Sequence, residues 1–553
     1  MMLPLRSLVS AFAAVVLLTS CAQYASVDEK RPTFPIHMTR TAEELSVSER
    51  IANARKLERR DPLSAIGKYL EAARRSADVL AGDPTNEVAR QTYNYALARV
   101  FSTIRDAKLD PWTKPLIVPS GQGEMTLTYR PDSRKAWNPS FYTFTPADQF
   151  DVKGKYVSKH TKKDGIGAPL VAVGKELNTG IEENFFIPRA YYGVTAVARF
   201  EKQRCTLSFE DPLATETTKL SGRVFPLAAD FTVPLAVMLA STNPKKLELS
   251  RMLHPQKYAE TARIARLQPY DPNKTVVLVI HGLMDTPATW APMLNALRGD
   301  ERIRKNYQFW FYSYPSGYPY PQSAAILRRQ LDAIEKKFPL RKPMVVIGHS
   351  MGGCISRVLM TDSRDKIWMD LLGEPPEKMR LSAESKALLA DMLIFRHRPE
   401  IGRVIFISAP LRGSDLAVNP LGRFGAELIQ TPITLLKAGN EVLKYIKTEG
   451  DSLKLKRMPN SVDTLAPNNR FVVAINKLPL APGIPYHTIM GDRGKGGNEN
   501  RTKPVRSDGV VPYWSSHMEG AVSELVVPSN HSAHQNAQAI AEVDRILRTY
   551  AAE

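Results

Sequence analysis

The segment 345–353 constrains this chain more than any other, because an apolar run ends there in the pattern Gly-x-Ser-x-Gly. The four residues before Gly348 favour a β-strand, and residues 354–360 are compatible with a helix. Ser350 is therefore expected in a tight strand-to-helix turn, where flanking glycines without a Cβ atom leave its hydroxyl open to a substrate. The five-residue pattern alone arises by chance in many chains, but this context predicts a nucleophilic serine.

A nucleophilic serine needs a general base and an acid that orients the base, and candidates for both follow in the C-terminal region. Asp508 lies in the turn-prone loop 507–512 after a predicted strand at 486–490, and it is the predicted acid. His531 lies between a predicted last strand at 524–528 and a terminal amphipathic helix expected at about residues 538–550. His531 is the predicted base: it would take the proton of the Ser350 hydroxyl while Asp508 holds its other ring nitrogen.

Both assignments have competitors. Asp492 follows the strand more closely than Asp508, but the glycine-rich stretch after Asp492 is a poor platform for a buried acid. His534 and His517 compete with His531, which comes first after the strand. The alternatives therefore stay open at this point.

The reaction also needs donors for the negative charge that develops on the former carbonyl oxygen, since losing one donor raises the barrier by about 3–4 kcal/mol. The residue after the nucleophile, Met351, supplies one backbone amide. The loop 281–284, which follows a predicted strand at 275–280, supplies the other, with Leu283 as the expected donor. His281 could be mistaken for a catalytic base, but it is expected to shape this loop.

Four blocks together resemble the lipase and esterase branch of the α/β-hydrolase superfamily. They are the loop 279–283, the elbow 348–353, the segment 408–414, and the tail that runs from 507–512 to His531. The order of Ser350, Asp508 and His531 is the order of that family. The resemblance covers residues from about 270 to the end, and it implies an α/β fold with a mostly parallel sheet, helices on both faces, and hydrolysis of a carboxylic ester through an acyl-serine.

The N-terminus predicts a bacterial lipoprotein. Arg6 precedes the apolar segment 8–18, which is too short to span a bilayer and is typical of a signal peptide. The following Leu-Thr-Ser-Cys resembles a lipobox, so that Cys21 would carry the lipid and anchor the chain to a membrane. By analogy, Ala22 favours the outer membrane, facing the periplasm. The alternative is a cleaved secretory signal with an incidental cysteine.

Cysteine and histidine usage predicts chemistry without a metal or organic cofactor. The chain has 3 Cys and 10 His, and these are not clustered at ligand spacing. A disulfide framework is excluded, although one bridge between Cys205 and Cys354 is possible in an oxidising compartment. Cys354, just inside the helix behind the elbow, is expected to be a buried apolar residue.

The chain of 553 residues is longer than a domain with a single hydrophobic core usually is, so we expect several domains or regions. They are a signal peptide at 1–20, a helical region at 21–120, a β-rich domain at 121–260 and the catalytic domain at 265–553. The β-rich part is expected to be antiparallel. The segment 416–466 is interpreted as an insertion that forms either an apolar lid or an ordinary packed helix pair.

The formal net charge of +19 indicates attraction to anionic surfaces such as acidic lipid headgroups. No nucleic-acid-binding motif accompanies it, so nucleic acid is not an expected partner. An acyl-ester or lipid substrate, a membrane and a protein partner at the N-terminal helices are the expected partners. The leading hypothesis is an envelope serine esterase or lipase; the alternatives are an acyltransferase with the same triad and a non-catalytic binding or scaffold lipoprotein.

Overall fold

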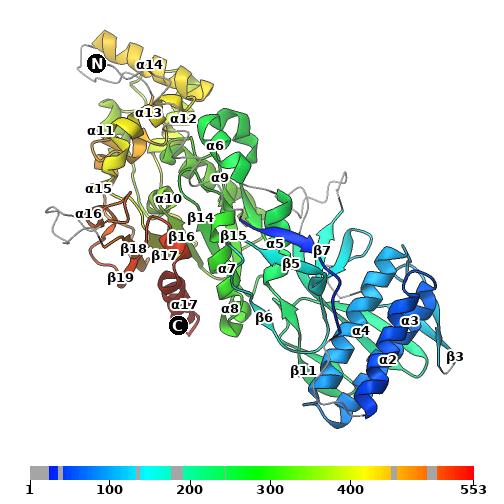
Figure 1. The fold of residues 1–553 in the computed structure, drawn as a ribbon. Coiled ribbons are helices and arrows are strands. Elements are labelled where there is room, and N and C mark those ends of the chain that lie inside the picture. Colours follow the sequence, from blue (N-terminus) through cyan, green and yellow to red (C-terminus); the bar gives the residue numbers. More distant parts are fainter. Residues whose placement is uncertain are drawn as a thin grey trace, which may run out of the picture.

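The computed structural model describes residues 24–34, 42–121, 123–131, 137–175, 191–242, 245–449, 458–494 and 507–552. Figure 1 shows an elongated molecule with the N-terminal helices and strands at one end and a larger α/β unit at the other. The predicted signal segment 1–20 and Cys21 lie outside the described residues, so lipidation stays a prediction. Within the described ranges, no helix combines the length and the apolar character that crossing a bilayer requires.

A seven-stranded sheet lies at the centre of the described C-terminal part, in the order β13-β15-β14-β16-β17-β18-β19. All neighbouring strands are parallel except β13 and β15. Every residue of β14 and β16 is buried, which explains their unbroken apolar sequences. The strands are β13 (Arg263–Arg266), β14 (Thr275–Ile280), β15 (Tyr307–Ser313), β16 (Met344–His349), β17 (Ile401–Ile407), β18 (Tyr486–Asp492) and β19 (Ser523–Pro528).

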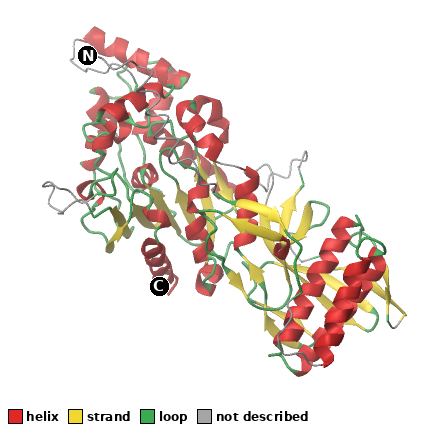
Figure 2. Cartoon of the chain, viewed as in Figure 1, coloured by secondary structure: helices red, strands yellow, loops and turns green. Residues whose placement is uncertain are grey.

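Helices cover both faces of this sheet (Figures 1 and 2). Val276 and Leu278 of β14 pack into one core, and Val277 and Val279 pack into another, because successive strand residues point to opposite faces. The predicted α/β-hydrolase architecture is confirmed. The first core includes α9 (Tyr320–Lys337), α10 (Met351–Leu359), α11 (Lys366–Leu372), α12 (Ala383–Leu393) and α15 (Arg470–Asn476); the second includes α7 (Ala291–Leu297), α8 (Glu301–Asn306) and α17 (Ala537–Ala552).

The segment 416–466 contributes two helices, α13 (Pro420–Leu428) and α14 (Ile433–Glu449). Leu435, Ala438 and Val442 of α14 are buried in the same core as β14 and α9, whereas Ile433 is 72% exposed. The α14 helix therefore packs as an ordinary amphipathic helix. Other short helices are α5 (Thr232–Thr242), α6 (Lys245–Leu253) and α16 (Tyr513–Ser516), and the 3₁₀ helices are η1 (Ala147–Gln149), η2 (Pro255–Thr261), η3 (Pro287–Trp290), η4 (Asp415–Ala417), η5 (Asp463–Leu465) and η6 (Ala533–Gln535).

After the short strand β1 (Ser26–Glu29), the N-terminal half has the helical segment that the sequence predicts, made of α2 (Ala42–Leu57), α3 (Pro62–Gly82) and α4 (Glu87–Asp106). Asp61 caps α3 by accepting from the amide of Ser64, and Asn86 caps α4 by accepting from the amide of Ala89. The buried faces of α3 and α4 share one core with the neighbouring β-sheet.

That sheet has six strands in the order β2-β3-β9-β8-β7-β4. The expectation of an antiparallel sheet is wrong at one place, because β3 and β9 pair in parallel. Alternation of apolar residues does not encode strand direction, and here the β8–β9 hairpin docks beside a strand that is remote in sequence. The strands of this half are β1 (Ser26–Glu29), β2 (Leu116–Ser120), β3 (Gly123–Tyr129), β4 (Tyr142–Pro146), β5 (Phe150–Lys153), β6 (Lys162–Lys163), β7 (Ala168–Gly174), β8 (Tyr191–Glu201), β9 (Arg204–Glu210), β10 (Thr217–Leu220), β11 (Arg223–Pro226) and β12 (Ala229–Asp230).

The two halves are joined by a continuous core and by buried charge. Tyr156 and Val157 of the β-rich part share a core with β14 and α17 of the α/β part. Arg304 on α8 donates from Nε and Nη2 to the two carboxylate oxygens of Glu216, each at 2.7 Å, and Lys163 donates to the same carboxylate. The N-terminal half therefore buttresses the side of the sheet that carries α7, α8 and α17.

Candidate active site

Ser350 lies in a sharp turn between β16 and α10. Its backbone angles, φ of 53° and ψ of −125°, lie in a strained region that residues other than glycine rarely adopt. An added Cβ at Gly348 would lie 2.5 Å from the Gly352 carbonyl oxygen, and one at Gly352 would lie 2.3 Å from the Ile280 carbonyl oxygen. Both glycines are thus needed for the close approach of β16, α10 and β14, and the sequence prediction of a strand-to-helix turn is confirmed.

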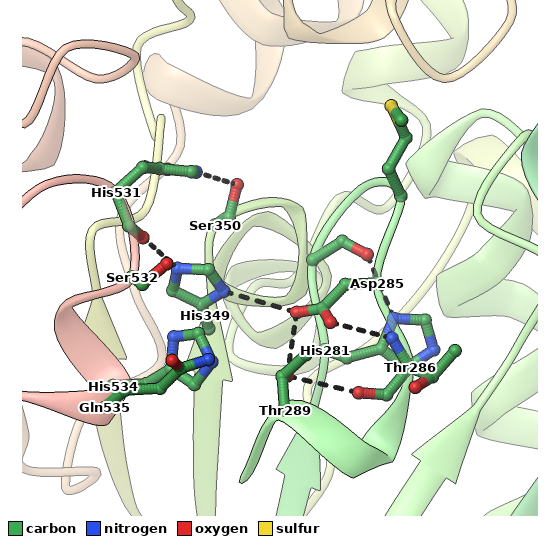
Figure 3. Close-up of polar contacts among 12 residues, drawn as sticks. His281, Asp285, Thr286, Thr289, His349, Ser350, His531, Ser532, His534 and Gln535 are labelled. Atoms are coloured by element: carbon green, nitrogen blue, oxygen red, sulfur yellow. Dashed lines mark hydrogen bonds and ion pairs between the residues drawn. The ribbon is translucent and has the colours of Figure 1, made fainter. Parts of the chain in front are cut away.

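The structure brings Ser350, His531 and Asp508 together. His531 Nε2 lies 2.8 Å from Ser350 Oγ, and His531 Nδ1 lies 2.7 Å from Asp508 Oδ2 (Figure 3 shows the Ser350 contact). With Nδ1–H donated to the carboxylate, Nε2 carries a lone pair that accepts from the Ser350 hydroxyl. This tautomer is the one that removes a proton from the serine.

Asp508 contacts His531 although it follows the end of β18 by many residues. The Arg493 amide donates to the Ser507 carbonyl oxygen at 3.0 Å, so the chain returns to the end of β18 before Asp508. An added Cβ at Gly491 would lie 2.9 Å from the Asp508 Cβ, which explains a glycine inside this strand. The competing Asp492 accepts from the Gly494 amide at 3.0 Å and so shapes its own loop.

Asp508 is held as a carboxylate. Its Oδ1 accepts from the amides of Val510 and Val511 at 2.8 and 2.7 Å, and its side chain is 1% exposed. Burial alone would raise the pKa of Asp508, but the adjacent His531 ring and these hydrogen bonds outweigh burial and lower it. The two carboxylate oxygens thus have different partners: Oδ1 accepts from the backbone of the loop that follows Asp508, and Oδ2 accepts from His531.

The loop 281–284 lies directly against the serine. An added Cβ at Gly282 would lie 2.9 Å from the Ser350 Cβ and 3.3 Å from His349 Nδ1. The next residues are the predicted donor Leu283 and then Met284, whose amide donates to Ser316 Oγ at 3.1 Å. The loop therefore places Gly282, the neighbour of the predicted donor Leu283, against Ser350.

His281 is structural, as expected from its place before Gly282. It is fully buried and stacks on Tyr314 with ring centroids 4.3 Å apart. Its Nδ1–H donates to the Gly282 carbonyl oxygen at 2.9 Å, and its Nε2 accepts from the Tyr314 amide at 3.3 Å. Burial lowers the pKa of His281 to about 4, so the ring stays neutral while it shapes the loop.

The competing bases lie elsewhere. His517 contacts Glu524 at 2.7 Å through Nδ1, away from Ser350. His534 is 2% exposed and packs against the ring of His349, with centroids 4.0 Å apart. Burial lowers the pKa of His534 well below its ordinary value, and His349 adds to this while the Thr289 backbone opposes it.

Sequence reasoning missed His349, the residue that precedes the nucleophile. Its Nε2–H donates to the backbone oxygen of His531 at 2.7 Å, and its Nδ1 lies 3.8 Å from Asp285 Oδ2. These contacts connect the elbow to the loops that carry the base and Leu283 (Figure 3). The only signal in the sequence was a histidine inside the Gly-x-Ser-x-Gly pattern.

Apolar residues of α6 and α13 cover the loop that carries Leu283. Buried Met252 and Ile429 pack together, and Leu283 and Met284 lie against this cluster. The Gln430 amide donates to the Leu253 carbonyl oxygen at 2.8 Å, which ties the end of α13 to the end of α6. Ser350 itself is buried, with 6% of its surface exposed.

The two remaining cysteines, Cys205 and Cys354, are both free and buried. The disulfide that the sequence allowed between them is therefore not formed, because they belong to different cores. The expectation that Cys354 is a buried apolar residue is confirmed, since it is 3% exposed.

Residues 276–543 match the model of the alpha/beta hydrolase family. Among solved structures, the chain is similar to the mature Bacillus licheniformis lipase BlEst2, at 16% identity and a TM-score of 0.30, over 50% of this chain and 93% of that one. It is also similar to the metagenomic carboxyl esterase MGS0156, at 16% identity and a TM-score of 0.28, over 52% and 78%. The phospholipase PlaB from Legionella pneumophila gives 14% identity and a TM-score of 0.29, over 50% and 58%.

Comparison with curated proteins finds no match. The similarities to solved structures carry no argument about substrate. The family match and the sheet establish the α/β-hydrolase fold of this part of the chain.

Proposed function

From the α/β-hydrolase fold of residues 276–543, we propose that this chain is a serine hydrolase that cleaves carboxylic acyl esters through an acyl-serine. The observation that carries the proposal is the bridge made by His531, 2.8 Å from Ser350 Oγ and 2.7 Å from Asp508 Oδ2. Ser350 is the nucleophile, His531 the base and Asp508 the acid.

Acylation follows from this geometry. Ser350 Oγ attacks the ester carbonyl carbon while His531 Nε2 accepts the hydroxyl proton, and Asp508 stabilises the imidazolium. The tetrahedral intermediate collapses when the C–O bond to the alcohol breaks and His531 returns the proton to the leaving alkoxide. Water then attacks the acyl-serine, His531 again takes and returns a proton, and the carboxylic acid leaves with Ser350 restored.

The oxyanion of both tetrahedral intermediates would accept from the backbone amides of Met351 and Leu283. Met351 is the first residue of α10, so the positive end of the helix adds to its amide. The close approach of Gly282 to Ser350 supports Leu283 as the second donor. Each such donor stabilises the transition state by about 3–4 kcal/mol.

The apolar cover supports an acyl or lipid ester as the substrate. Met252 lies on α6 and Ile429 directly follows α13, and both pack next to Leu283, so an acyl chain that enters beside the oxyanion site meets hydrocarbon rather than charge. Ser350 is 6% exposed, and entry therefore requires these helices to move apart. In this proposal α6 and α13 form the lid over the site.

We place this activity at the bacterial envelope, with lipidated Cys21 as the anchor in the outer membrane. The support is the apolar segment 8–18 followed by Leu-Thr-Ser-Cys, together with the net charge of +19, which suits anionic headgroups. The test is fractionation of cells that express the chain or Cys21→Ser. The proposal expects wild type in the membrane fraction and the variant in the soluble fraction; equal distribution would refute the anchor.

The activity test is hydrolysis of p-nitrophenyl esters from acetate to palmitate by the full chain in detergent. Wild type is expected to turn over, and Ser350→Ala to lose at least about a thousandfold. Ser382→Ala, which removes a helix cap on α12 and an exposed hydrogen bond to Glu441, should match wild type. A fluorophosphonate should label wild type and Ser382→Ala but not Ser350→Ala.

The same assay separates the alternatives. If added alcohol diverts the acyl group into a new ester without slowing release of p-nitrophenol, the enzyme is an acyltransferase. If no ester is cleaved and Ser350 takes no label, the chain is a scaffold that keeps a hydrolase fold.

A further inference from the structure

Three buried side chains meet beside the candidate active site, and each comes from a different segment of that site. Asp285 follows the loop of Leu283, His349 precedes Ser350, and His534 follows His531 by three residues. Their nearest ligand-type atoms all lie within 4.8 Å of one another. Figure 3 shows the Asp285 carboxylate facing the His349 ring, with His534 packed beside that ring.

His349 is oriented as a ligand. Its Nε2–H is donated to the backbone oxygen of His531 at 2.7 Å, so the neutral ring carries its lone pair on Nδ1. Nδ1 is buried and has no hydrogen-bond partner. A histidine that donates its far N–H to a backbone carbonyl while its near nitrogen is bare has the arrangement that metal-binding histidines adopt.

Asp285 is oriented in the same way. Its Oδ1 accepts from the Thr286 amide at 2.8 Å, and its Oδ2 accepts from the Thr289 hydroxyl at 3.0 Å. A carboxylate oxygen has room for a further partner beyond one hydrogen bond. Oδ2 lies 3.8 Å from His349 Nδ1, too far for a hydrogen bond.

His534 completes the cluster. Its Nδ1 is buried without a hydrogen-bond partner, and its Nε2 lies 3.3 Å from the side-chain amide group of Gln535. The same group of Gln535 lies 3.3 Å from the Tyr156 hydroxyl. In this orientation the Gln535 amide donates to Nε2. Metal binding at Nδ1 requires a half-turn of the amide, after which its oxygen accepts from the His534 Nε2–H.

This arrangement is unfavourable unless a cation joins it. The bare Nδ1 of His349 and the Asp285 carboxylate face one another in a site from which water is largely excluded, since their side chains are 6% and 10% exposed. An ion bound by all three replaces these repulsions with three bonds. Ligands of a tetrahedral zinc ion lie roughly 3.4 Å apart, so small side-chain rotations from the observed separations are sufficient.

We propose that Asp285, His349 and His534 bind one divalent transition-metal ion, with Zn²⁺ as the best fit to two imidazoles and one carboxylate. Soft thiolate ligands are missing from the set, and two histidines disfavour Mg²⁺ and Ca²⁺, which prefer oxygen ligands. The ion does not touch Ser350. It clamps the loops that carry the nucleophile, the base and the Leu283 donor, so its role is structural.

The binding test needs no activity and therefore stands apart from the proposed function. The full chain in detergent is stripped with EDTA, dialysed, and titrated with ZnCl₂ in a calorimeter. We expect one Zn²⁺ per chain and a higher melting temperature with the ion than without it. Absence of binding by the stripped wild type would overturn the site.

Variants locate the bound ion. Asp285→Asn and His534→Ala should each weaken Zn²⁺ binding by at least about tenfold. His397→Ala is the matched control, because His397 also contacts a carboxylate, Asp362, but on the surface, with side chains 36% and 41% exposed. His531→Ala tests the triad as a competing site. Loss of binding in either control, or its retention in both ligand variants, would refute the assignment.

A spectroscopic measurement on wild type covers the case in which the ligand variants do not fold. Co²⁺ bound by two imidazoles and a carboxylate in four-coordinate geometry absorbs strongly in the visible range, whereas the six-coordinate aqueous ion absorbs weakly. The site predicts the strong spectrum at one equivalent and its loss on addition of Zn²⁺. A spectrum that stays weak would count against the cluster.

Discussion

Replacement of Asp508 by Asn is the sharpest test of the proposed mechanism, because the structure dictates how the amide must orient. Oδ1 accepts from the two amides of Val510 and Val511, while Oδ2 accepts only from His531. The asparagine oxygen therefore has to occupy the Oδ1 position, since its NH₂ group there would face two N–H donors. Its NH₂ group then faces His531 Nδ1.

This orientation of the asparagine amide forces His531 into the other tautomer. Nδ1 of His531 would have to accept from the amide, so the proton would move to Nε2, and Nε2–H would donate to Ser350 Oγ instead of accepting from it. A base in the wrong tautomer lowers kcat by about ten-thousandfold, which corresponds to about 5.5 kcal/mol of barrier. The fold should persist because the shape of the side chain and both backbone hydrogen bonds are kept.

The assay is kcat on p-nitrophenyl butyrate, with a thermal melt of the same sample. Asp492→Asn is the matched control, since Asp492 accepts from the Gly494 amide in a neighbouring loop, and its kcat should stay within about threefold of wild type. The reasoning fails if Asp508→Asn keeps more than about a tenth of the activity, or if Asp492→Asn shows the larger loss.

Three further predictions follow from contacts of single residues. Gly282→Ala should lower kcat about a hundredfold, because its Cβ would lie 2.9 Å from the Ser350 Cβ and displace the oxyanion loop. Glu216→Gln should destabilise the fold by about 3 kcal/mol, because it leaves the buried Arg304 guanidinium without a carboxylate partner; denaturant titration measures this. The pKa of His281 is about 4 in the folded chain and 6.5 in the unfolded chain, so between these pH values only the unfolded chain takes up the proton. The free energy of unfolding should therefore fall by about 3 kcal/mol as the pH falls from 6.5 to 4. In His281→Asn, this part of the pH dependence of unfolding should vanish.

Matched variants control the first two of these predictions. An added Cβ at Gly82 would meet nothing within 4 Å, so Gly82→Ala should leave kcat unchanged. Glu384 pairs with Lys437 on the surface, with both side chains more than half exposed, so Glu384→Gln should change stability by less than about 1 kcal/mol. Equal effects of a variant and its control would show that the contact named is not the cause. For His281, an unfolding midpoint that falls equally with pH in wild type and His281→Asn would assign the proton uptake to other groups.

Patterns that are local in the chain were enough to predict the catalytic part of the fold. Apart from Thr275 and His349 at their ends, β14 and β16 have no polar residue because both faces of each strand are covered, and such runs are visible in any window of six residues. The turn at Ser350 was equally visible, since its glycines are required by backbone contacts within a few residues and with the adjacent strand β14. The positions of Ser350, Asp508 and His531 relative to the strands then followed from the order that the resemblance implies.

Contacts between remote segments were decided only by the tertiary structure. Asp508 rather than Asp492 reaches His531 because the chain returns to the end of β18 at Ser507, and no local pattern encodes where a loop returns. The parallel pairing of β3 with β9 depends on docking, which alternation of apolar residues leaves undetermined.

The cluster of Asp285, His349 and His534 shows the same division most clearly. These residues lie far apart in the sequence, at no ligand spacing, and each is unremarkable in its own segment. They meet because parallel strands end at one edge of a sheet, which brings the end of β16 together with the loops after β14 and β19. The sequence by itself determined the elements and the predicted nucleophile. The tertiary structure decided which side chains share a site, because residues remote in the sequence come close only when the strands assemble into the sheet.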